Sequence, residues 1–187
     1  RGACRLGVLG GQCTRAGRKE ALRWFVGRLR LAVKGGGSPG DNLHITTKFI
    51  GEWPEPRLDE MKRALTSVPV RGAFDIAVKG LGWFPNARRP RVFWAGVEGG
   101  EQLRTLAQAT EQVAAELGVP VEDRAYSPHL TLARIREGVP LERLHQTIAS
   151  LPTGCGFDFG SFSATKSFLY LSAGGKYTQL AGLPLDS

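Results

Sequence analysis

Two short segments of the sequence carry the same pair of chemically useful side chains. His44 and Thr46 lie in NLHITTKFIGE, and His129 and Thr131 lie in SPHLTLARIR. In a strand, residues two apart face the same side, so each segment would present an imidazole beside a hydroxyl while apolar residues anchor its other side. Two imidazoles that face each other across a cleft can act as a base and an acid.

Strict strand alternation makes further predictions about these segments. It places Lys48 on the same face as His44 and places Phe49 on the opposite, apolar face. His145 begins a third copy of the pattern, HQT, in a stretch with helical spacing, where residues two apart point in different directions. We therefore expect His145 to lie on a helix surface, outside any site.

Two other chemistries lack local support in the sequence. A metal site usually needs three or four protein ligands, and neither segment places a Cys, Asp or Glu beside its histidine on the same strand face. The sequence also has no G-x-x-x-x-G-K-[ST] loop to cradle the phosphates of a nucleoside triphosphate. We therefore expect neither a metal nor a cofactor.

Length and composition favour one compact unit with a polyanionic partner. The 187 residues, 42% of them hydrophobic, suit one domain or two closely joined lobes. The net charge of +8 favours RNA, DNA or a phosphate ester as a partner. The odd set of Cys4, Cys13 and Cys155 favours a reducing compartment, and no apolar run approaches the roughly 20 residues of a membrane span. We expect a soluble cytoplasmic protein that needs no membrane and no obligate protein partner.

The spacing of apolar residues predicts helices and strands in an irregular order. Strands come as hairpins and singles between helices rather than in steady alternation with them, which favours an α+β fold with antiparallel sheets. Besides the two motif strands at 43–50 and 128–135, the predicted strands span 6–9, 73–84, 91–98, 157–164, 167–172 and 177–185. The predicted helices begin at 18 and span 55–68, 101–117 and 140–151, the third with Gly118 as its C-terminal cap.

The paired motifs resemble a known enzyme family. LHITTKFIGE and PHLTLARIR, with GLGWFPNARRPRVFWAGV between them, are similar to the 2H phosphoesterase superfamily, in particular its RNA 2′,3′-cyclic phosphodiesterase branch, also called the 2′-5′ RNA ligase-like family. The resemblance runs from Asn42 to the C-terminal GGKYTQLAGLPL. It implies one bilobed catalytic domain over residues 1–187, in which two pseudo-symmetric lobes with antiparallel sheets and outer helices each place one H-x-T strand at a central cleft.

The resemblance also implies an activity and roles for the motif residues. The implied reaction is metal-independent hydrolysis of a 2′,3′-cyclic phosphate, at an RNA end or in a small cyclic nucleotide, to a 2′-phosphomonoester. His44 would be the general acid and His129 the general base. Thr46 and Thr131 would donate hydrogen bonds to the non-bridging oxygens. The same residues could also catalyse 2′-5′ ligation, and a catalytically inactive RNA-binding module is a further alternative.

Residues outside the H-x-T pairs are expected to help bind the substrate. Arg134 matches a family position that holds the phosphate, although strict alternation places it on the wrong face unless the strand ends or bulges before it. The hairpin turn carries candidates for contacts with backbone phosphates, and the aromatic residues that flank it could stack on a base. These candidates are Arg88, Arg89, Arg91, Phe84 and Trp94.

Overall fold

The computed structural model describes residues 3–8, 43–69, 72–138, 140–149, 157–174 and 176–185. The helix predicted to begin at residue 18 lies outside the described residues, as do Cys13 and Cys155. Among the described residues, no helix is both long and apolar enough to cross a membrane.

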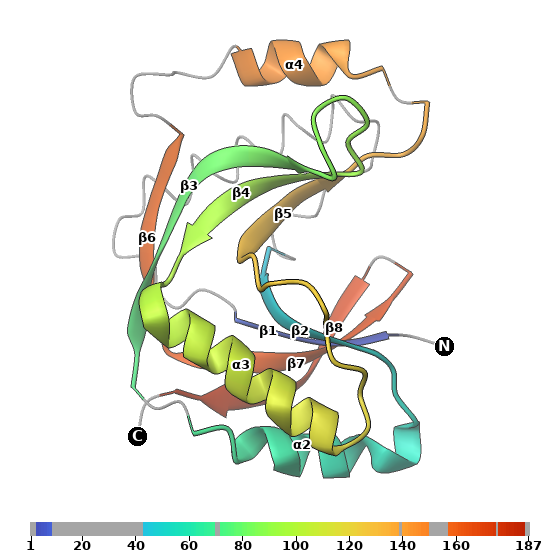
Figure 1. Ribbon diagram of the computed structural model, residues 1–187, viewed down its shortest axis with the longest axis vertical. Helices are drawn as coiled ribbons and strands as arrows, with labels where there is room; N and C mark the ends of the chain where they lie inside the picture. Colours follow the sequence, from blue (N-terminus) through green and yellow to red (C-terminus); the bar gives the residue numbers. More distant parts are fainter. Residues whose placement is uncertain are drawn as a thin grey trace.

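Eight strands form one antiparallel sheet (Figure 1). Along the sheet the order is β6-β3-β4-β5-β2-β1-β7-β8, so β5 and β2 lie at its centre with three strands beyond each. The strands are β1 (Ala3–Val8), β2 (Ile45–Glu52), β3 (Phe74–Phe84), β4 (Val92–Glu98), β5 (His129–Arg134), β6 (Asp158–Ala164), β7 (Lys166–Ala173) and β8 (Lys176–Pro184).

The helices cover parts of this sheet and build two hydrophobic clusters. The described helices are the short 3₁₀ helix η2 (Glu55–Arg57), α2 (Leu58–Thr66), α3 (Gly100–Glu116) and α4 (Glu142–Ala149). In Figure 1, α2 and α3 lie against the lower half, whereas α4 lies at the far end of the upper half. One cluster joins α3 and α4 to β3, β4 and β5, and the other joins α2 and α3 to β2, β7 and β8. Because α3 packs into both clusters, it braces the two halves of the sheet against each other.

Among the described residues, the two halves of the sheet meet at one backbone pair. Ile45 of β2 pairs with Leu130 of β5 in antiparallel register, and their side chains are 1% and 6% exposed. The expected antiparallel pairing is confirmed, and because the two motif strands pair, the strands of both halves belong to one continuous sheet. Since both residues belong to the same hydrophobic cluster, burial supports this contact as well as backbone pairing.

Most predicted elements are confirmed, with boundaries that differ by a few residues. The spacing of Met61 and Leu65 predicts a helix face that the structure buries, and Gly118 adopts a φ of 92° just after α3 as a C-terminal cap. The glycine-rich strand predicted at 6–9 begins earlier, at Ala3. It tolerates Gly7 because β1 lies inside the sheet and is paired with β2 on one side and β7 on the other.

The junction between the halves should be a main source of stability. Replacing Ile45 by Ala removes buried methyl groups from a side chain that is 1% exposed, so the free energy of unfolding should fall by about 2–5 kcal/mol. The matched control is Val121→Ala, at a side chain that is 62% exposed, and it should have almost no effect. Urea unfolding measures both, and equal effects of the two substitutions would contradict this view of the junction.

Candidate active site at the junction of the two motif strands

The pairing of Ile45 with Leu130 brings the two H-x-T motifs together. Each of these residues lies between the histidine and the threonine of its own motif, and each points into the core. Residues opposite each other in an antiparallel pair share a face, and their chain neighbours share the other face. The remaining motif residues therefore flank the junction on the face away from this core, and all are half-buried: His44, Thr46, His129 and Thr131.

One hydrogen bond fixes the orientation of His129. Its Nδ1 lies 2.8 Å from the backbone oxygen of Ser127. A carbonyl oxygen can only accept, so Nδ1 carries the proton, and in the neutral ring Nε2 keeps a free lone pair. His129 thus offers a base at the nitrogen opposite its anchor.

Aromatic rings surround His129 on the same face. Phe84 lies edge-on to the imidazole at 5.0 Å between ring centroids, and Trp94 lies at 6.3 Å. The two aromatic rings are 5.1 Å apart and both are half-buried. The indole Nε1 of Trp94 is buried and makes no hydrogen bond with the residues that the structure describes. The structure therefore groups both of the predicted stacking residues with His129.

His44 has a different aromatic environment from His129. The ring centroid of Tyr177, on β8, lies 4.5 Å from that of His44, and Tyr170, on β7, lies at 5.9 Å. Tyr170 is 5% exposed, and burial raises its pKa to about 12, so it remains a neutral phenol at physiological pH. Two tyrosine rings thus lie beside His44, whereas a phenylalanine and a tryptophan lie beside His129.

A β-bulge in β5 brings Arg134 to the motif face. Trp94 pairs with Thr131, whereas Val92 pairs with Arg134, and the register shift between them leaves Leu132 as the extra residue. Val92 and Trp94 are two apart on β4 and share a face, so Thr131 and Arg134 share that face as well. Arg134 therefore lies on the motif face because β5 contains a bulge before it, as the sequence analysis required.

A second bulge in β2 overturns one prediction. Thr46 and Lys48 pair with positions 7 and 6 of β1, so Thr47 is the extra residue and the alternation is reversed beyond it. Lys48 is 4% exposed and bonds to Glu111 of α3, on the helix-covered side. The prediction that Lys48 shares the face of His44 is wrong because the strand does not alternate strictly.

The same bulge exposes an aromatic residue that the sequence placed on the wrong side. Phe49 is 50% exposed and pairs with position 5, two residues from the partner of Thr46, so it shares the face of Thr46 rather than the core face. Both bulges directly follow the motif threonine, which makes Phe49 the counterpart of Arg134. Phe49 follows His44 by five residues, just as Arg134 follows His129 by five, and this equal spacing could have identified Phe49 from the sequence.

The arginines of the hairpin turn lie next to the end of β5. The side-chain oxygen of Asn86 accepts hydrogen bonds from the backbone of Arg88 and Arg89, at 3.0 and 3.1 Å, and shapes the turn. The backbone N–H of Ile135 donates to the oxygen of Arg91 at 2.9 Å, which joins the turn to β5. Within the described ranges, no ion pair involves the exposed arginines of this end: Arg88, Arg89, Arg91, Arg134 and Arg136.

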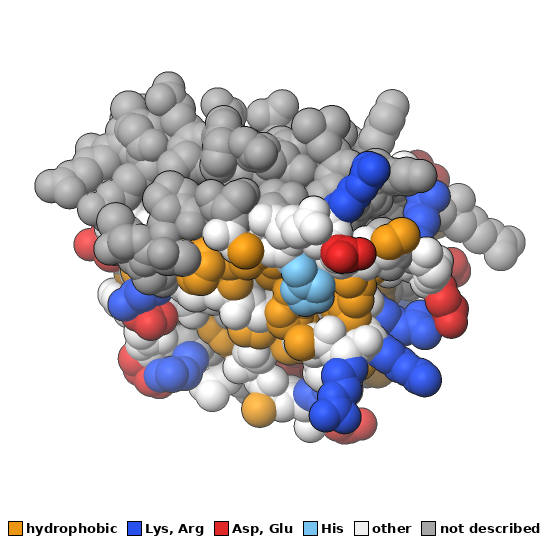
Figure 2. Space-filling model, turned by 90° about the horizontal axis from the view of Figure 1, so that it is seen from above, with side chains coloured by type: hydrophobic (Ala, Val, Ile, Leu, Met, Phe, Trp, Pro, Cys, Tyr) orange, Lys and Arg blue, Asp and Glu red, His pale blue; other side chains and the backbone are white. Residues whose placement is uncertain are grey.

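The surface view supports a concentration of positive charge at this end. Figure 2 shows the molecule from above, with hydrophobic side chains and a histidine in the central area. Lys and Arg side chains lie on both sides of this area, with more of them on the right, the side of the β3–β4 turn in Figure 1, where Asp and Glu side chains also lie. The exposed arginines of the turn and of the end of β5 form a basic rim, and such a rim can bind several phosphates at once.

The third H-x-T copy lies where the sequence predicted. His145 is exposed on α4, and its ring contacts Trp83 at 5.6 Å between centroids. Trp83 in turn packs against the core residue Phe93 at 4.4 Å. His145 therefore belongs to the packing of α4 and provides a natural control for the motif histidines.

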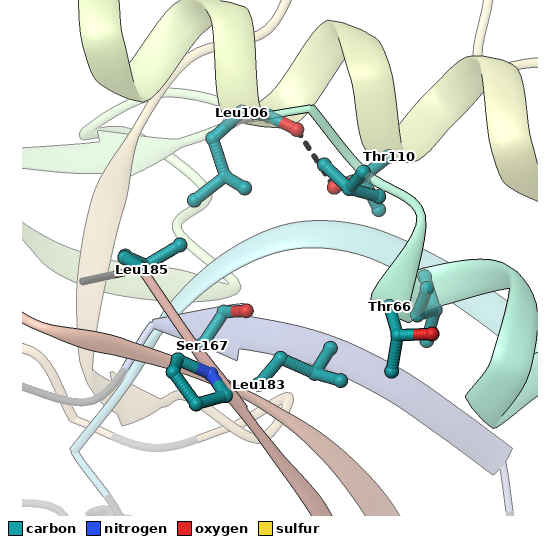
Figure 3. A pocket seen from close by; sticks show the side chains of 9 residues that line it. Thr66, Leu106, Thr110, Ser167, Leu183 and Leu185 are labelled. Atoms are coloured by element: carbon teal, nitrogen blue, oxygen red, sulfur yellow. Dashed lines mark hydrogen bonds between the residues drawn. The ribbon is translucent and has the colours of Figure 1, made fainter. Parts of the chain in front are cut away.

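A cavity on the helix-covered side offers no competing chemistry (Figure 3). Its volume is about 80 Å³, and apolar side chains of α2, α3 and the C-terminal segment line most of it. The buried hydroxyl of Thr110 in its wall already donates to the backbone oxygen of Leu106 at 2.7 Å. Across the residues that the structure describes, no three His, Cys, Asp or Glu side chains gather closely enough to hold a metal ion.

Solved structures share this fold. The chain superposes on the Thermus thermophilus protein TT0787 with a TM-score of 0.72 at 27% identity, covering 98% of this chain and 97% of that one. It superposes on Escherichia coli LigT, solved in complex with 3′-AMP, with a TM-score of 0.70 at 24% identity, covering 98% of both chains. The molecule is thus an α+β protein with the fold of the LigT-like 2H phosphoesterases.

Sequence comparison gives the family. Residues 18–177 match the 2′-5′ RNA ligase superfamily, and the chain belongs to that family. It is 32% identical over 139 residues to the RNA 2′,3′-cyclic phosphodiesterase of Methanothermobacter thermautotrophicus, which covers 71% of this chain and 74% of that protein.

Two further relatives bear the same name and are matched over less of their length. The Aeropyrum pernix protein is 39% identical over 117 residues, covering 59% of this chain and 66% of that protein. The Geobacillus stearothermophilus protein is 30% identical over 150 residues, covering 78% of this chain and 46% of that protein. The chain thus spans less than two thirds of the length of both relatives.

The aromatic group around His129 depends on a glycine. A Cβ atom added at Gly82 would lie 2.1–2.6 Å from ring atoms of Trp94, so Gly82→Ala should displace the indole and lower the free energy of unfolding by about 1–3 kcal/mol. The ring-proton NMR signals of His129 should shift with it. Gly182→Ala, whose Cβ would meet its nearest neighbour at 3.4 Å, is the control and should leave these signals in place. Unchanged signals in both variants would contradict this dependence.

Proposed function

We propose that this chain is a metal-independent RNA 2′,3′-cyclic phosphodiesterase that converts a terminal cyclic phosphate to a 2′-phosphomonoester. The observation that carries the proposal is the pairing of Ile45 with Leu130, which sets the two H-x-T motifs side by side on one face. The names of the relatives support the same activity. The nucleotide bound in the LigT structure agrees with a ligand of this class.

We propose that the two halves of the sheet act as pseudo-symmetric lobes of one catalytic domain. Four strands lie on each side of the β5–β2 junction, and each half supplies one H-x-T strand to it. Equivalent bulges after the motif threonines support this correspondence. A cyclic phosphate at the junction would then be approached by one histidine from each lobe.

The proposed reaction is an in-line displacement at phosphorus. His129 Nε2 takes a proton from water, the water oxygen forms a bond to phosphorus, the bond from phosphorus to the 3′ oxygen breaks, and His44 gives its proton to that oxygen. The orientation of His129 supports its role, because the anchor on Ser127 leaves Nε2 as a base. The acid role of His44 follows from the family resemblance and from its place on the opposite side of the junction.

The remaining motif residues would bind the phosphate and the nucleotide. Thr46 and Thr131 would donate hydrogen bonds to the non-bridging oxygens, and Arg134 would balance their negative charge. Phe84 and Phe49 offer faces on which bases could stack, because both lie on the motif face and Phe49 is 50% exposed.

The direct test is hydrolysis of an RNA oligomer that ends in a 2′,3′-cyclic phosphate, with EDTA present and the product isomer identified. His44→Ala and His129→Ala should each lower kcat by about 10²–10⁴-fold, because each removes one proton-transfer step. His145→Ala, the same change on a helix surface, should leave kcat unchanged. Hydrolysis that survives either motif substitution, or a 3′-phosphate product, would overturn the proposed mechanism.

The same experiment separates the alternative activities. Joining of RNA ends through a 2′-5′ bond without net hydrolysis would indicate a ligase. Binding of the oligomer by a well-folded parent without any conversion would indicate an RNA-binding module.

The arginine rim predicts how activity depends on salt. Arg88→Ala or Arg91→Ala should raise KM for an RNA oligomer and reduce the slope of log kcat/KM against log salt by about 1, because one phosphate contact is lost. Neither should change kcat for a nucleoside 2′,3′-cyclic phosphate, which has no further phosphates. Arg104→Ala, at an exposed arginine on α3, is the control. Slopes equal to that of Arg104→Ala would show that the turn does not bind RNA.

A further inference from the structure

The segment 119–128, here called the strap, connects α3 to β5 without regular secondary structure. It begins beside the first motif strand and ends directly before His129. Hydrogen bonds attach it along its length to β2 and α3, and its last residues orient the histidine. The strap therefore links the two motifs by a route separate from the sheet.

An ion pair between a buried lysine and a half-buried glutamate holds the first part of the strap. The ammonium group of Lys48, which is 4% exposed, lies 2.5 Å from Oε1 of Glu111 and donates to the backbone oxygen of Pro120 at 2.8 Å. The same carboxylate oxygen accepts the backbone N–H of Glu122 at 3.1 Å. A buried lysine needs such partners because its charge has left water. The bulge that turns Lys48 away from the motif face thus allows its ammonium group to hold the start of the strap.

A tyrosine holds the last part of the strap. The hydroxyl of Tyr126 donates to the backbone oxygen of Thr46 at 3.3 Å, and its half-buried ring packs against the core cluster below the motif strands. Burial raises the pKa of Tyr126 far above its usual value, so the hydroxyl stays protonated and remains a donor. This bond runs from the strap to the first motif itself.

The next residue along the strap orients His129. Ser127 follows Tyr126 directly, and its backbone oxygen is the acceptor for Nδ1 of His129 at 2.8 Å. The position of that oxygen is set by the residues on either side, of which Tyr126 is the one bonded to β2. A shift of the strap would therefore move the acceptor away from the imidazole.

We propose that Tyr126 is a positioning residue for His129, and that Lys48 and Glu111 support it by fixing the start of the strap. The bond from Tyr126 to Thr46 makes the tautomer and orientation of one motif histidine depend on the other motif strand. The proposal concerns the geometry of His129, and only its catalytic consequence rests on the proposed function.

The test uses two variants with matched controls. Tyr126→Phe removes one hydroxyl, and its control is Thr110→Val, which removes a buried hydroxyl that also donates to a backbone oxygen. Glu111→Gln removes the charge of the strap carboxylate, and its control is Glu60→Gln in the exposed pair with Arg57. Thermal unfolding confirms that each variant folds.

The main measurement is ¹⁵N NMR of the histidine rings at a pH of about 8.5, where an ordinary imidazole is neutral. The His129 signals, assigned with His129→Ala, should show a dominant Nδ1–H tautomer in the parent and in both controls. That fraction should fall in Tyr126→Phe and in Glu111→Gln. With the cyclic-phosphate substrate, kcat should fall on the order of 10- to 100-fold while KM changes little, because the base is misplaced rather than lost.

Two outcomes would overturn the proposal. The first is that the His129 nitrogen signals are the same in Tyr126→Phe and in Thr110→Val. The second is that kcat falls in Tyr126→Phe while those signals stay unchanged. A parent that hydrolyses no cyclic phosphate would refute the proposed function instead, and the tautomer measurement would still decide the role of the strap. If Tyr126→Phe does not fold, Glu111→Gln carries the same comparison.

Discussion

The pairing of two buried residues, Ile45 and Leu130, is the constraint on which the rest of the structure depends. Each is the middle residue of an H-x-T motif, so packing them side by side in the core forces the polar residues around them onto the opposite face. The sheet order follows from the same contact, because each motif strand carries three further strands away from it. Helix α3 then packs into both hydrophobic clusters and keeps the halves from separating. The histidines are thus held together by the core beneath them.

Equivalent β-bulges give the two halves different tasks. In β5 the bulge places Arg134 on the face of Thr131, where its guanidinium adds positive charge beside the motif. In β2 the bulge places the exposed ring of Phe49 at the corresponding position and turns Lys48 into the protein. One half therefore presents a cation and the other an aromatic face. The buried lysine holds the strap that leads to His129, so a single irregularity shapes both faces of the strand.

Local patterns predicted most of the elements but not how they join. The apolar spacing of α2 and α3 and the hairpin of β3 and β4 could be identified because their signals lie within one segment. The repeated motif and its family resemblance singled out His44 and His129 as candidates, and the pairing of Ile45 with Leu130 brings their motifs together. The continuous sheet, the faces of Lys48 and Phe49, and the anchor of His129 on Ser127 could not be predicted in the same way. Each depends on a register shift or a backbone contact that strict alternation does not describe.

We propose that both motifs bind one phosphate group at the junction of β2 and β5. A crystal structure of the protein with a nucleoside 2′-phosphate, the product of the proposed reaction, would show where this phosphate lies. A single phosphate should lie within hydrogen-bonding distance of His44 and His129, with Arg134 beside it and the base near Phe84 or Phe49. A phosphate that contacts only one of the histidines, or that binds in the cavity between α2, α3 and the C-terminal segment, would contradict it.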